Sequence, residues 1–205
     1  MWQWMFALVV GYLLGSIPVG FLVARWLRGM DVRRVGSGRT GGTNVLRVAG
    51  WEAAVLTGVG DGLKAVLAVL LARWLGGPPF LLALAGVAAV AGHNYSVFLR
   101  FRGGAGTMAS IGGAVVLWPL CGLILVPVLL VVALGTRRAS LGSITIAFLL
   151  PALFVLRAAL GVGPWAYVAY GVLTSALTLW ALRPNIRRLL RGEERRIDLR
   201  ASRRQ

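Results

Sequence analysis

Two glycine-rich stretches carry polar residues whose types and spacing suit the binding of phosphate groups. The first, GSGRTGGTNVLR, occupies residues 36–47, and the second, FRGGAG, occupies residues 101–106. Glycine adopts backbone conformations closed to other residues, so successive amide N–H groups can point into one concavity that holds an anion. Arginine guanidinium groups and short hydroxyl side chains add hydrogen-bond donors for phosphate oxygens. A flexible turn is the alternative for either stretch alone, and the presence of both favours anion binding.

The candidate site residues come from these stretches and from the residues just before the second one. His93 is the only histidine of the chain, and its imidazole could orient or deprotonate a hydroxyl group. The alternative for His93 is a structural histidine at a helix end. Ser37, in the first stretch, is the second catalytic candidate. The candidate substrate-binding residues of the two stretches are Gly38, Arg39, Thr40, Gly41, Thr43, Asn44, Arg47, Arg102, Gly103, Gly104 and Gly106.

The composition is that of an integral membrane protein. Of the 205 residues, 58% are hydrophobic, and the mean hydropathy of +0.80 is far above that of a soluble domain of this size. Basic residues outnumber acidic ones by 22 to 6, but they lie between and after apolar runs, which is a topology signal rather than a nucleic-acid footprint. One cysteine and one histidine exclude an internal disulfide and a multi-histidine or cysteine-based metal site. We therefore expect no protein-held metal and no nucleic-acid partner.

Apolar runs separated by glycine, proline and arginine predict an all-α membrane bundle of seven helices. Each long run is sufficient to cross a bilayer, and the first is interrupted near Pro18, which neighbouring helices can tolerate. The expected helices are residues 4–27, 51–75, 80–98, 107–118, 120–134, 141–156 and 165–182.

Arginine placement predicts the orientation of this bundle. The first loop is rich in arginine and the start of the chain has no basic side chain, so the N-terminus is expected outside and the C-terminus in the cytoplasm. Residues 107–134 must then form a short helical hairpin, because one full span would place the arginine-rich end of the chain outside. We expect a single transmembrane domain over residues 1–183 and a basic cytoplasmic tail over residues 184–205. This tail should lie along anionic lipid headgroups or remain mobile.

Two charged residues lie inside the second predicted span. Asp61 and Lys64 are three residues apart and therefore share a helix face. Charges at such depth are costly unless they face the bundle interior or a polar cavity. We expect Lys64 or Asp61 to line the site from beneath, with Lys64 as a candidate substrate-binding residue, and the alternative is a self-neutralising structural pair.

Five segments between residues 15 and 194 carry a family resemblance: GSIPVG, SGRTGGTNVLRVAG, DGLKA, GHNYSVFLRFRGGAGTMAS and NIRRLLRGEE. In this order they resemble the PlsY family of acyl-phosphate:glycerol-3-phosphate acyltransferases. The resemblance implies acyl transfer from a fatty acyl phosphate to glycerol 3-phosphate, giving lysophosphatidate and phosphate in phospholipid synthesis. It also implies a multi-pass protein of the bacterial inner (plasma) membrane, with its active site facing the cytoplasm and no cofactor.

The resemblance implies one further site residue, and this sequence departs from the family pattern at several positions, two of which bear on phosphate binding. It implies that Asn185 closes the site from the C-terminal end. Arg39 stands where the family pattern has asparagine, and Ala105 stands where it has lysine. We predict that the Arg39 guanidinium reaches the space that a lysine at position 105 would fill, because a guanidinium binds phosphate in bidentate fashion. Two alternatives are a non-catalytic relative that binds lipid or phosphate ligands, and a small transporter, which the broken first helix and the buried charge pair would suit.

Overall fold

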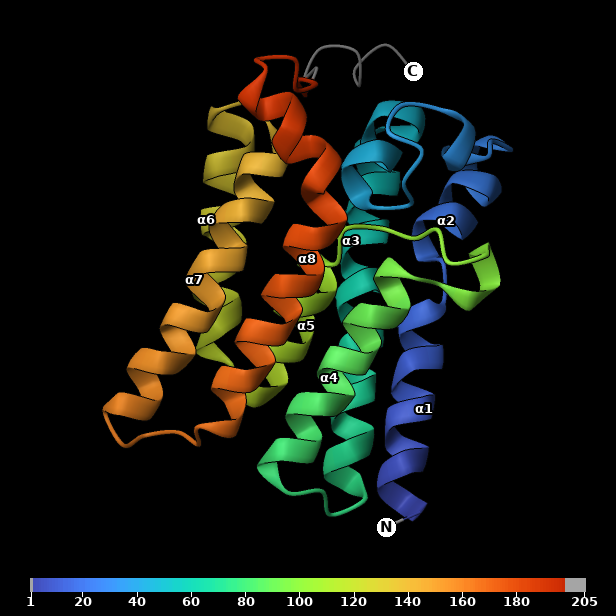
Figure 1. Ribbon diagram of the computed structural model, residues 1–205. Helices are drawn as coiled ribbons and strands as arrows, with labels where there is room; N and C mark the ends of the chain where they lie inside the picture. The colour runs from blue at the N-terminus through green and yellow to red at the C-terminus, as the bar shows by residue number, and fades with distance from the viewer. Residues whose placement is uncertain (1, 198–205) are drawn as a thin grey trace.

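The computed structural model describes residues 2–197, and within that range the regular structure is entirely helical (Figure 1). The helices form one bundle, in which α1 begins at one end and α8 finishes at the other (Figure 1). The expected all-α bundle of seven helices is confirmed when α1 and α2 are taken as the two halves of the broken first helix. The helices are α1 Trp2–Ser16, α2 Val19–Arg28, α3 Gly42–Trp74, α4 Pro79–Asn94, α5 Thr107–Leu117, α6 Leu120–Gly135, α7 Ala139–Ala159 and α8 Ala166–Leu190, with 3₁₀ turns η1 Val32–Arg34 and η2 Val97–Leu99.

The break between α1 and α2 follows from Pro18, which has no backbone N–H and disfavours a helical residue before it. Two carbonyl groups at the break are bonded by side chains from other segments. The hydroxyl of Ser96 donates to the Ser16 carbonyl at 2.5 Å, and Lys64 Nζ donates to the Ile17 carbonyl at 2.9 Å. The loosened backbone is thus satisfied inside the bundle, as a membrane interior requires.

Among residues 2–197, four helical segments are long and apolar enough to cross a membrane, namely Trp2–Arg28, Gly42–Trp74, Pro79–Leu99 and Ala139–Ala159. Large apolar side chains lie on the outer surface, such as Leu123 and Val131, which are 74% and 71% exposed. Small residues instead fill the interior, where they let helices approach closely. A Cβ at Gly15 in α1, for example, would overlap the carbonyl oxygen of Ala89 in α4.

The helix α3 is bent at Gly50, whose φ of 85° is closed to most other residues. The bend separates residues 42–49 from residues 51–74, and the second part agrees with the expected span. The first part corrects an expectation, because Thr43, Asn44 and Arg47 were expected in a loop and instead lie in the first turns of a helix.

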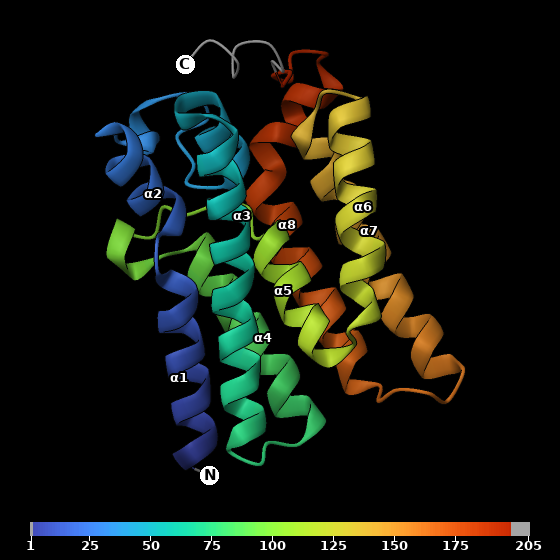
Figure 2. The ribbon, with the colours of Figure 1, turned by 180° about the vertical axis from the view of Figure 1, so that it is seen from behind.

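The expected hairpin is formed by α5 and α6, which turn at Trp118 and return to the end of the bundle where α8 finishes (Figures 1 and 2). Two arginines hold the turn from neighbouring helices. Arg73 of α3 donates to the Val116 carbonyl at 2.6 Å, and Arg157 of α7 donates to the Leu117 carbonyl at 3.2 Å. These bonds satisfy carbonyl groups that the end of α5 leaves unpaired. Both arginines therefore have a structural role at the turn of the hairpin.

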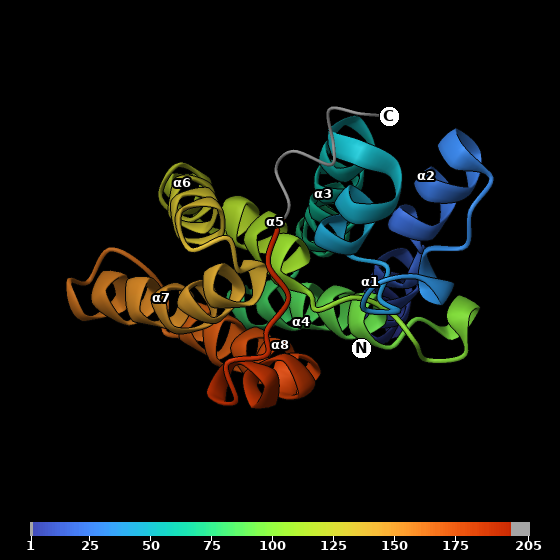
Figure 3. The ribbon, with the colours of Figure 1, turned by 90° about the horizontal axis from the view of Figure 1, so that it is seen from above.

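The last helix is longer than the span expected over residues 165–182. The helix α8 continues past position 183 to Leu190 and contains Pro184, and the chain then folds back over the bundle (Figure 3). The backbone N–H of Ile197 donates to the Arg137 carbonyl at 2.7 Å. We call residues 191–197 the C-terminal strap. Residues 198–205 of the predicted tail lie outside the described residues.

Candidate active site

A cavity of about 390 Å³ lies between α3, α5, α6, α7 and the end of α8. One end is polar and is bounded by the first glycine-rich stretch, the start of α5 and the C-terminal strap. The other end is apolar and is bounded by residues of α3 and α6, on either side of α5 (Figure 3). The apolar residues include Val55, Val59, Val126, Leu129 and Leu130. A ligand with an anionic group and a hydrocarbon chain fits this division.

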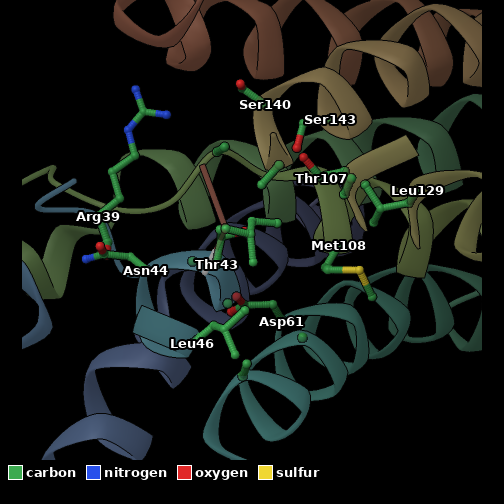
Figure 4. Close-up of a pocket in the computed structure, with 18 of the residues that line it drawn as sticks. Arg39, Thr43, Asn44, Leu46, Asp61, Thr107, Met108, Leu129, Ser140 and Ser143 are labelled. Carbon is green, nitrogen blue, oxygen red and sulfur yellow. The ribbon is translucent and has the colours of Figure 1, made fainter. Parts of the chain in front are cut away.

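Three helices begin at the polar end, and none of them has a side-chain cap. Their cap residues are Gly41 for α3, Gly106 for α5 and Arg138 for α7. The first amide N–H groups of a helix have no partner within it, and the helix dipole makes this end partly positive. Three such ends around one cavity are an arrangement that favours a bound anion. Figure 4 shows Thr43 and Ser140 beside two of them.

Unsatisfied hydroxyl groups reinforce this arrangement. Thr107 Oγ1 and Ser140 Oγ are buried and have no hydrogen-bond partner within residues 2–197. Both residues line the cavity, as does Ser143 (Figure 4). A buried hydroxyl without a partner is costly in an empty site and is ready to donate to a ligand.

Two arginines supply the positive side chains of the cavity wall, Arg39 from the first glycine-rich stretch and Arg47 from α3. The Arg39 guanidinium donates to the Ala181 carbonyl of α8, which ties the stretch to that helix. Burial lowers the pKa of Arg39 and the charge of Arg188 lowers it further, whereas Glu194 raises it. A desolvated guanidinium of this kind gains most from an anionic partner.

Asn44 shapes the first glycine-rich stretch from within. Its Nδ2 donates to the carbonyl groups of Val32, Val35 and Arg39 at 2.9–3.0 Å, and its Oδ1 accepts from the Ser37 N–H at 2.9 Å. The side chain is 2% exposed. Asn44 therefore holds the loop that presents Ser37 and Arg39, while its own amide group is occupied.

The second glycine-rich stretch packs against the end of α4. The N–H groups of Gly103 and Gly104 donate to the Asn94 and His93 carbonyl groups at 3.1 and 3.0 Å. A Cβ at Gly104 would overlap Nε2 of His93. The two glycines thus allow close approach of the loop to His93, and their amides are already bonded. This corrects the expectation that Gly103 and Gly104 offer free amides to an anion, a role that the start of α5 can fill.

His93 contacts the charge pair of α3. Its Nδ1 lies 3.3 Å from Asp61 Oδ1, and the same oxygen lies 3.0 Å from Lys64 Nζ. All three side chains are buried, but Asp61 and His93 line the cavity and Lys64 does not.

The structure brings most of the predicted site residues to one cavity. Those that line it are Ser37, Arg39, Gly41, Thr43, Asn44, Arg47, His93, Gly106 and Asn185. Those that lie outside its lining are Gly38, Thr40, Lys64, Arg102, Gly103 and Gly104.

Sequence reasoning missed Thr107, Ser140, Ser143 and Glu194, which also line the cavity. Thr107 could have been found, because a hydroxyl residue directly after the glycine run and before an apolar run marks a helix start. Glu194 accepts from Asn185 Nδ2 at 2.8 Å and from Arg188 Nε at 3.1 Å. These bonds fix Asn185 beside the cavity mouth, and no local pattern indicates them.

Comparison with known proteins identifies the family of this chain. A family model described as glycerol-3-phosphate acyltransferase matches residues 5–192. The chain belongs to the glycerol-3-phosphate acyltransferase family. It is 47% identical to the glycerol-3-phosphate acyltransferase of Rubrobacter xylanophilus over 188 residues, which cover 92% of each chain. It is also 47% identical to that of one Thermus thermophilus strain over 194 residues, which cover 95% of each chain.

The fold of this family member is similar to that of solved structures. The crystal structure of PlsY, an integral membrane glycerol 3-phosphate acyltransferase, in its glycerol 3-phosphate form superposes with a TM-score of 0.87 at 35% identity. The superposition covers 98% of this chain and 99% of that one. The lysophosphatidic acid form superposes with a TM-score of 0.83, and it covers 94% of each chain at 35% identity. The chain is therefore an integral membrane protein of the PlsY fold.

Proposed function

We propose that the protein transfers a fatty acyl group from an acyl phosphate to glycerol 3-phosphate and forms lysophosphatidate and inorganic phosphate. The observation that carries this proposal is the convergence of three uncapped helix starts and two arginines on one end of a cavity with an apolar wall. Both substrates contain a phosphate group, and one also contains a hydrocarbon chain. The glycerol 3-phosphate and lysophosphatidic acid forms of the PlsY structure support this substrate and product.

Charge decides where each phosphate binds. We place glycerol 3-phosphate between Arg39 and Arg47, beside Ser37 and the start of α3, where charge-assisted hydrogen bonds are strongest. The phosphate of the donor then binds at the start of α5, with the Thr107 hydroxyl as a donor. This placement brings the glycerol hydroxyl and the acyl carbonyl to the same part of the cavity.

The apolar wall gives the acyl chain a path from the membrane. Val55, Val59 and Leu130 line the cavity and are also 58%, 53% and 49% exposed on the outer surface. The wall is thus continuous with the face that meets hydrocarbon. A fatty acyl phosphate can enter from the bilayer with its chain between α3 and α6 and its phosphate at the polar end.

An acyl phosphate is an activated mixed anhydride, so the reaction requires placement and charge stabilisation more than a strong nucleophile. A hydroxyl oxygen of glycerol 3-phosphate forms a bond to the acyl carbonyl carbon, and the bond from that carbon to the phosphate oxygen breaks. The hydroxyl proton passes to His93 or to the departing phosphate. The helix starts stabilise the negative charge that develops on the carbonyl oxygen and on the phosphate.

We infer that the polar end of the cavity faces the cytoplasm of a bacterial cell. Arg25 and Arg28 lie in the last turn of α2, Arg137 lies in the turn between α6 and α7, and Arg188 lies in the last turn of α8. Figure 1 shows that α2, α6 and α8 all finish toward this end of the bundle. The positive-inside rule favours the cytoplasmic side for such an end and the outside for the start of α1.

The test is an assay of the purified protein in detergent with radiolabelled glycerol 3-phosphate. Palmitoyl phosphate should support formation of labelled lysophosphatidate, whereas palmitoyl coenzyme A, which lacks the donor phosphate next to the acyl carbon, should not. Formation of labelled lysophosphatidate only from palmitoyl coenzyme A would contradict the proposal that an acyl phosphate is the donor. Absence of incorporation from both donors would favour the non-catalytic relative.

A further inference from the structure

The helix α3 leaves helical geometry at Gly50, inside an otherwise continuous run from Gly42 to Trp74. The φ of 85° and ψ of −176° at this residue fall in a region that is essentially restricted to glycine. A Cβ at position 50 would meet nothing within 4 Å. The space around Gly50 would therefore accept a larger residue, and it is the backbone conformation that requires glycine.

Residues 19–49, on the N-terminal side of this bend, form a unit with its own apolar core, which we call the α2 unit. Within it, α2 packs against the first part of α3, and Ala53 joins the cluster from just beyond the bend. The buried residues of the unit in this cluster are Ala24, Val32, Val45, Val48 and Ala49. A Cβ at Gly20 would overlap the Thr40 carbonyl oxygen, so α2 also lies directly against the first glycine-rich stretch. With the four bonds of Asn44, these contacts make α2, the stretch and the first turns of α3 one body.

The α2 unit is connected to the rest of the bundle through two breaks in helical structure. One is Pro18, between α1 and α2, and the other is Gly50. The unit carries Ser37, Arg39 and Arg47, where we place glycerol 3-phosphate, whereas the start of α5, where we place the donor phosphate, lies outside it. The direction of the bend at Gly50 thus sets where one phosphate site lies relative to the other.

We propose that Gly50 is a positioning residue, because the bend that it permits holds Arg39 and Arg47 at the place beside the start of α5 that acyl transfer requires. This proposal rests on the proposed function. The start of α3 lies about 12 Å along the helix from the bend, so a change of about 10° at Gly50 would displace it by about 2 Å. An error of about 1 Å in placement can lower a rate about 10²-fold.

Contacts across the cavity keep the α2 unit in this position. The Arg39 guanidinium donates to the Ala181 carbonyl of α8. Leu46, in the first part of α3, packs with Ala133 of α6 and Ile197 of the C-terminal strap. A residue that favours the helical conformation at position 50 would straighten α3 and pull the unit away from these contacts.

The test replaces Gly50 by residues that fit the space but differ in their tolerance of positive φ. Gly50→Ala should raise the KM for glycerol 3-phosphate about 10-fold or more and leave the KM for palmitoyl phosphate within about twofold of the parent value, because only the first site depends on the bend. Gly50→Asn should have a smaller effect in the same direction, since asparagine adopts positive φ more readily than alanine. Asparagine is also larger than alanine, so a steric cause would reverse this order.

Gly76→Ala is the matched control. Gly76 lies just past the end of α3, at the opposite end from the α2 unit, and its φ is 71°. A Cβ there would also meet nothing within 4 Å, and the residue does not line the cavity. This variant should therefore lose thermal stability as Gly50→Ala does, but it should keep both parent KM values.

Parent KM values in Gly50→Ala would overturn the proposal, as would an equal rise of both KM values or a larger effect of Gly50→Asn than of Gly50→Ala. If Gly50→Ala does not fold, the split between the two KM values in Gly50→Asn decides the matter. Failure of the proposed function would look different, because the parent itself would form no lysophosphatidate. Titration calorimetry with glycerol 3-phosphate would then decide: weaker binding to the Gly50 variants than to Gly76→Ala would support the role of Gly50, and equal binding would overturn it.

Discussion

Arg39 and Ala105 line the same cavity from two different loops, Arg39 with a cationic side chain and Ala105 with none. The Arg39 guanidinium is held at the Ala181 carbonyl, on the side of α8, and Figure 4 shows it extending away from Asp61. A phosphate bound beside Arg39 would receive the positive charge that Ala105 does not provide.

We predict that the two positions compensate one another. Arg39→Asn should raise the KM for a phosphate substrate about 10-fold or more, because a hydrogen bond to a charged group contributes about 1.5–3 kcal/mol. Ala105→Lys alone should have little effect or should inhibit by crowding two cations. The double variant should recover much of the lost affinity, as a double-mutant cycle on KM and kcat would show. Strictly additive effects would mean that positions 39 and 105 do not share a phosphate.

At the level of residues, composition and spacing identified the polar end of the site but not the role of each group. Hydroxyl and arginine residues in the first glycine-rich stretch were found because they are concentrated there. The four hydrogen bonds of Asn44 depend on how the loop folds around it, so a substrate contact and a structural role look alike in sequence. The contact between His93 and Asp61 joins residues 32 positions apart, which no local pattern indicates.

The second glycine-rich stretch is an element whose close packing leads to a prediction. Gly104→Ala would place a Cβ on Nε2 of His93, so the ring or the loop must move. We expect kcat to fall about 10²-fold, the size of a general-base contribution. Gly135→Ala is the matched control, because a Cβ there meets nothing within 4 Å and the residue, the last of α6, does not line the cavity. Equal activity of both variants would separate His93 from the reaction.

The C-terminal strap is a second element that leads to a prediction. Glu194 and Ile197 are 7% and 5% exposed, and both line the cavity. Ile197 packs with Leu46 of α3 and Ala133 of α6. A chain that ends at position 192 should therefore lose part of the cavity wall and show a higher KM for glycerol 3-phosphate, whereas a chain that ends at position 197 should remain close to the full chain. Equal KM values for both truncated chains would show that the strap is dispensable.

At the level of elements, the requirement that all arginine-rich segments lie on one side of the membrane predicted the α5–α6 hairpin. Pro18 predicted the break of the first helix. The end of α8 was placed too early, because Pro184 and the arginines after it resemble a helix stop. In the structure these residues continue the helix to Leu190, and tertiary bonds of Glu194 hold the chain that follows. Such stabilisation comes from packing rather than from local propensity.

The polar end of the cavity and the turn between α7 and α8 lie at opposite ends of the bundle (Figure 1). The proposed orientation therefore predicts from which side of the membrane a cysteine at each end reacts. In a Cys121→Ser background, Arg137→Cys should react with a membrane-impermeant reagent only from the cytoplasmic side, and Val162→Cys only from outside. Arg137 is exposed at the end where the strap lies, and Val162 is 63% exposed in the turn between α7 and α8. Reaction of both positions from the same side would contradict the proposed orientation.

The most direct measurement of the central claim follows both phosphates at once by ³¹P NMR in a reaction of the purified protein with palmitoyl phosphate and glycerol 3-phosphate. If one cavity holds both substrates and excludes water from the transfer, inorganic phosphate and lysophosphatidate should appear in equal amounts as the acyl phosphate signal falls. Without glycerol 3-phosphate, the acyl phosphate signal should persist. Release of phosphate without lysophosphatidate would mean that the protein hydrolyses acyl phosphate. That result would contradict the claim that one cavity holds both phosphate groups and the acyl chain and excludes water from the transfer.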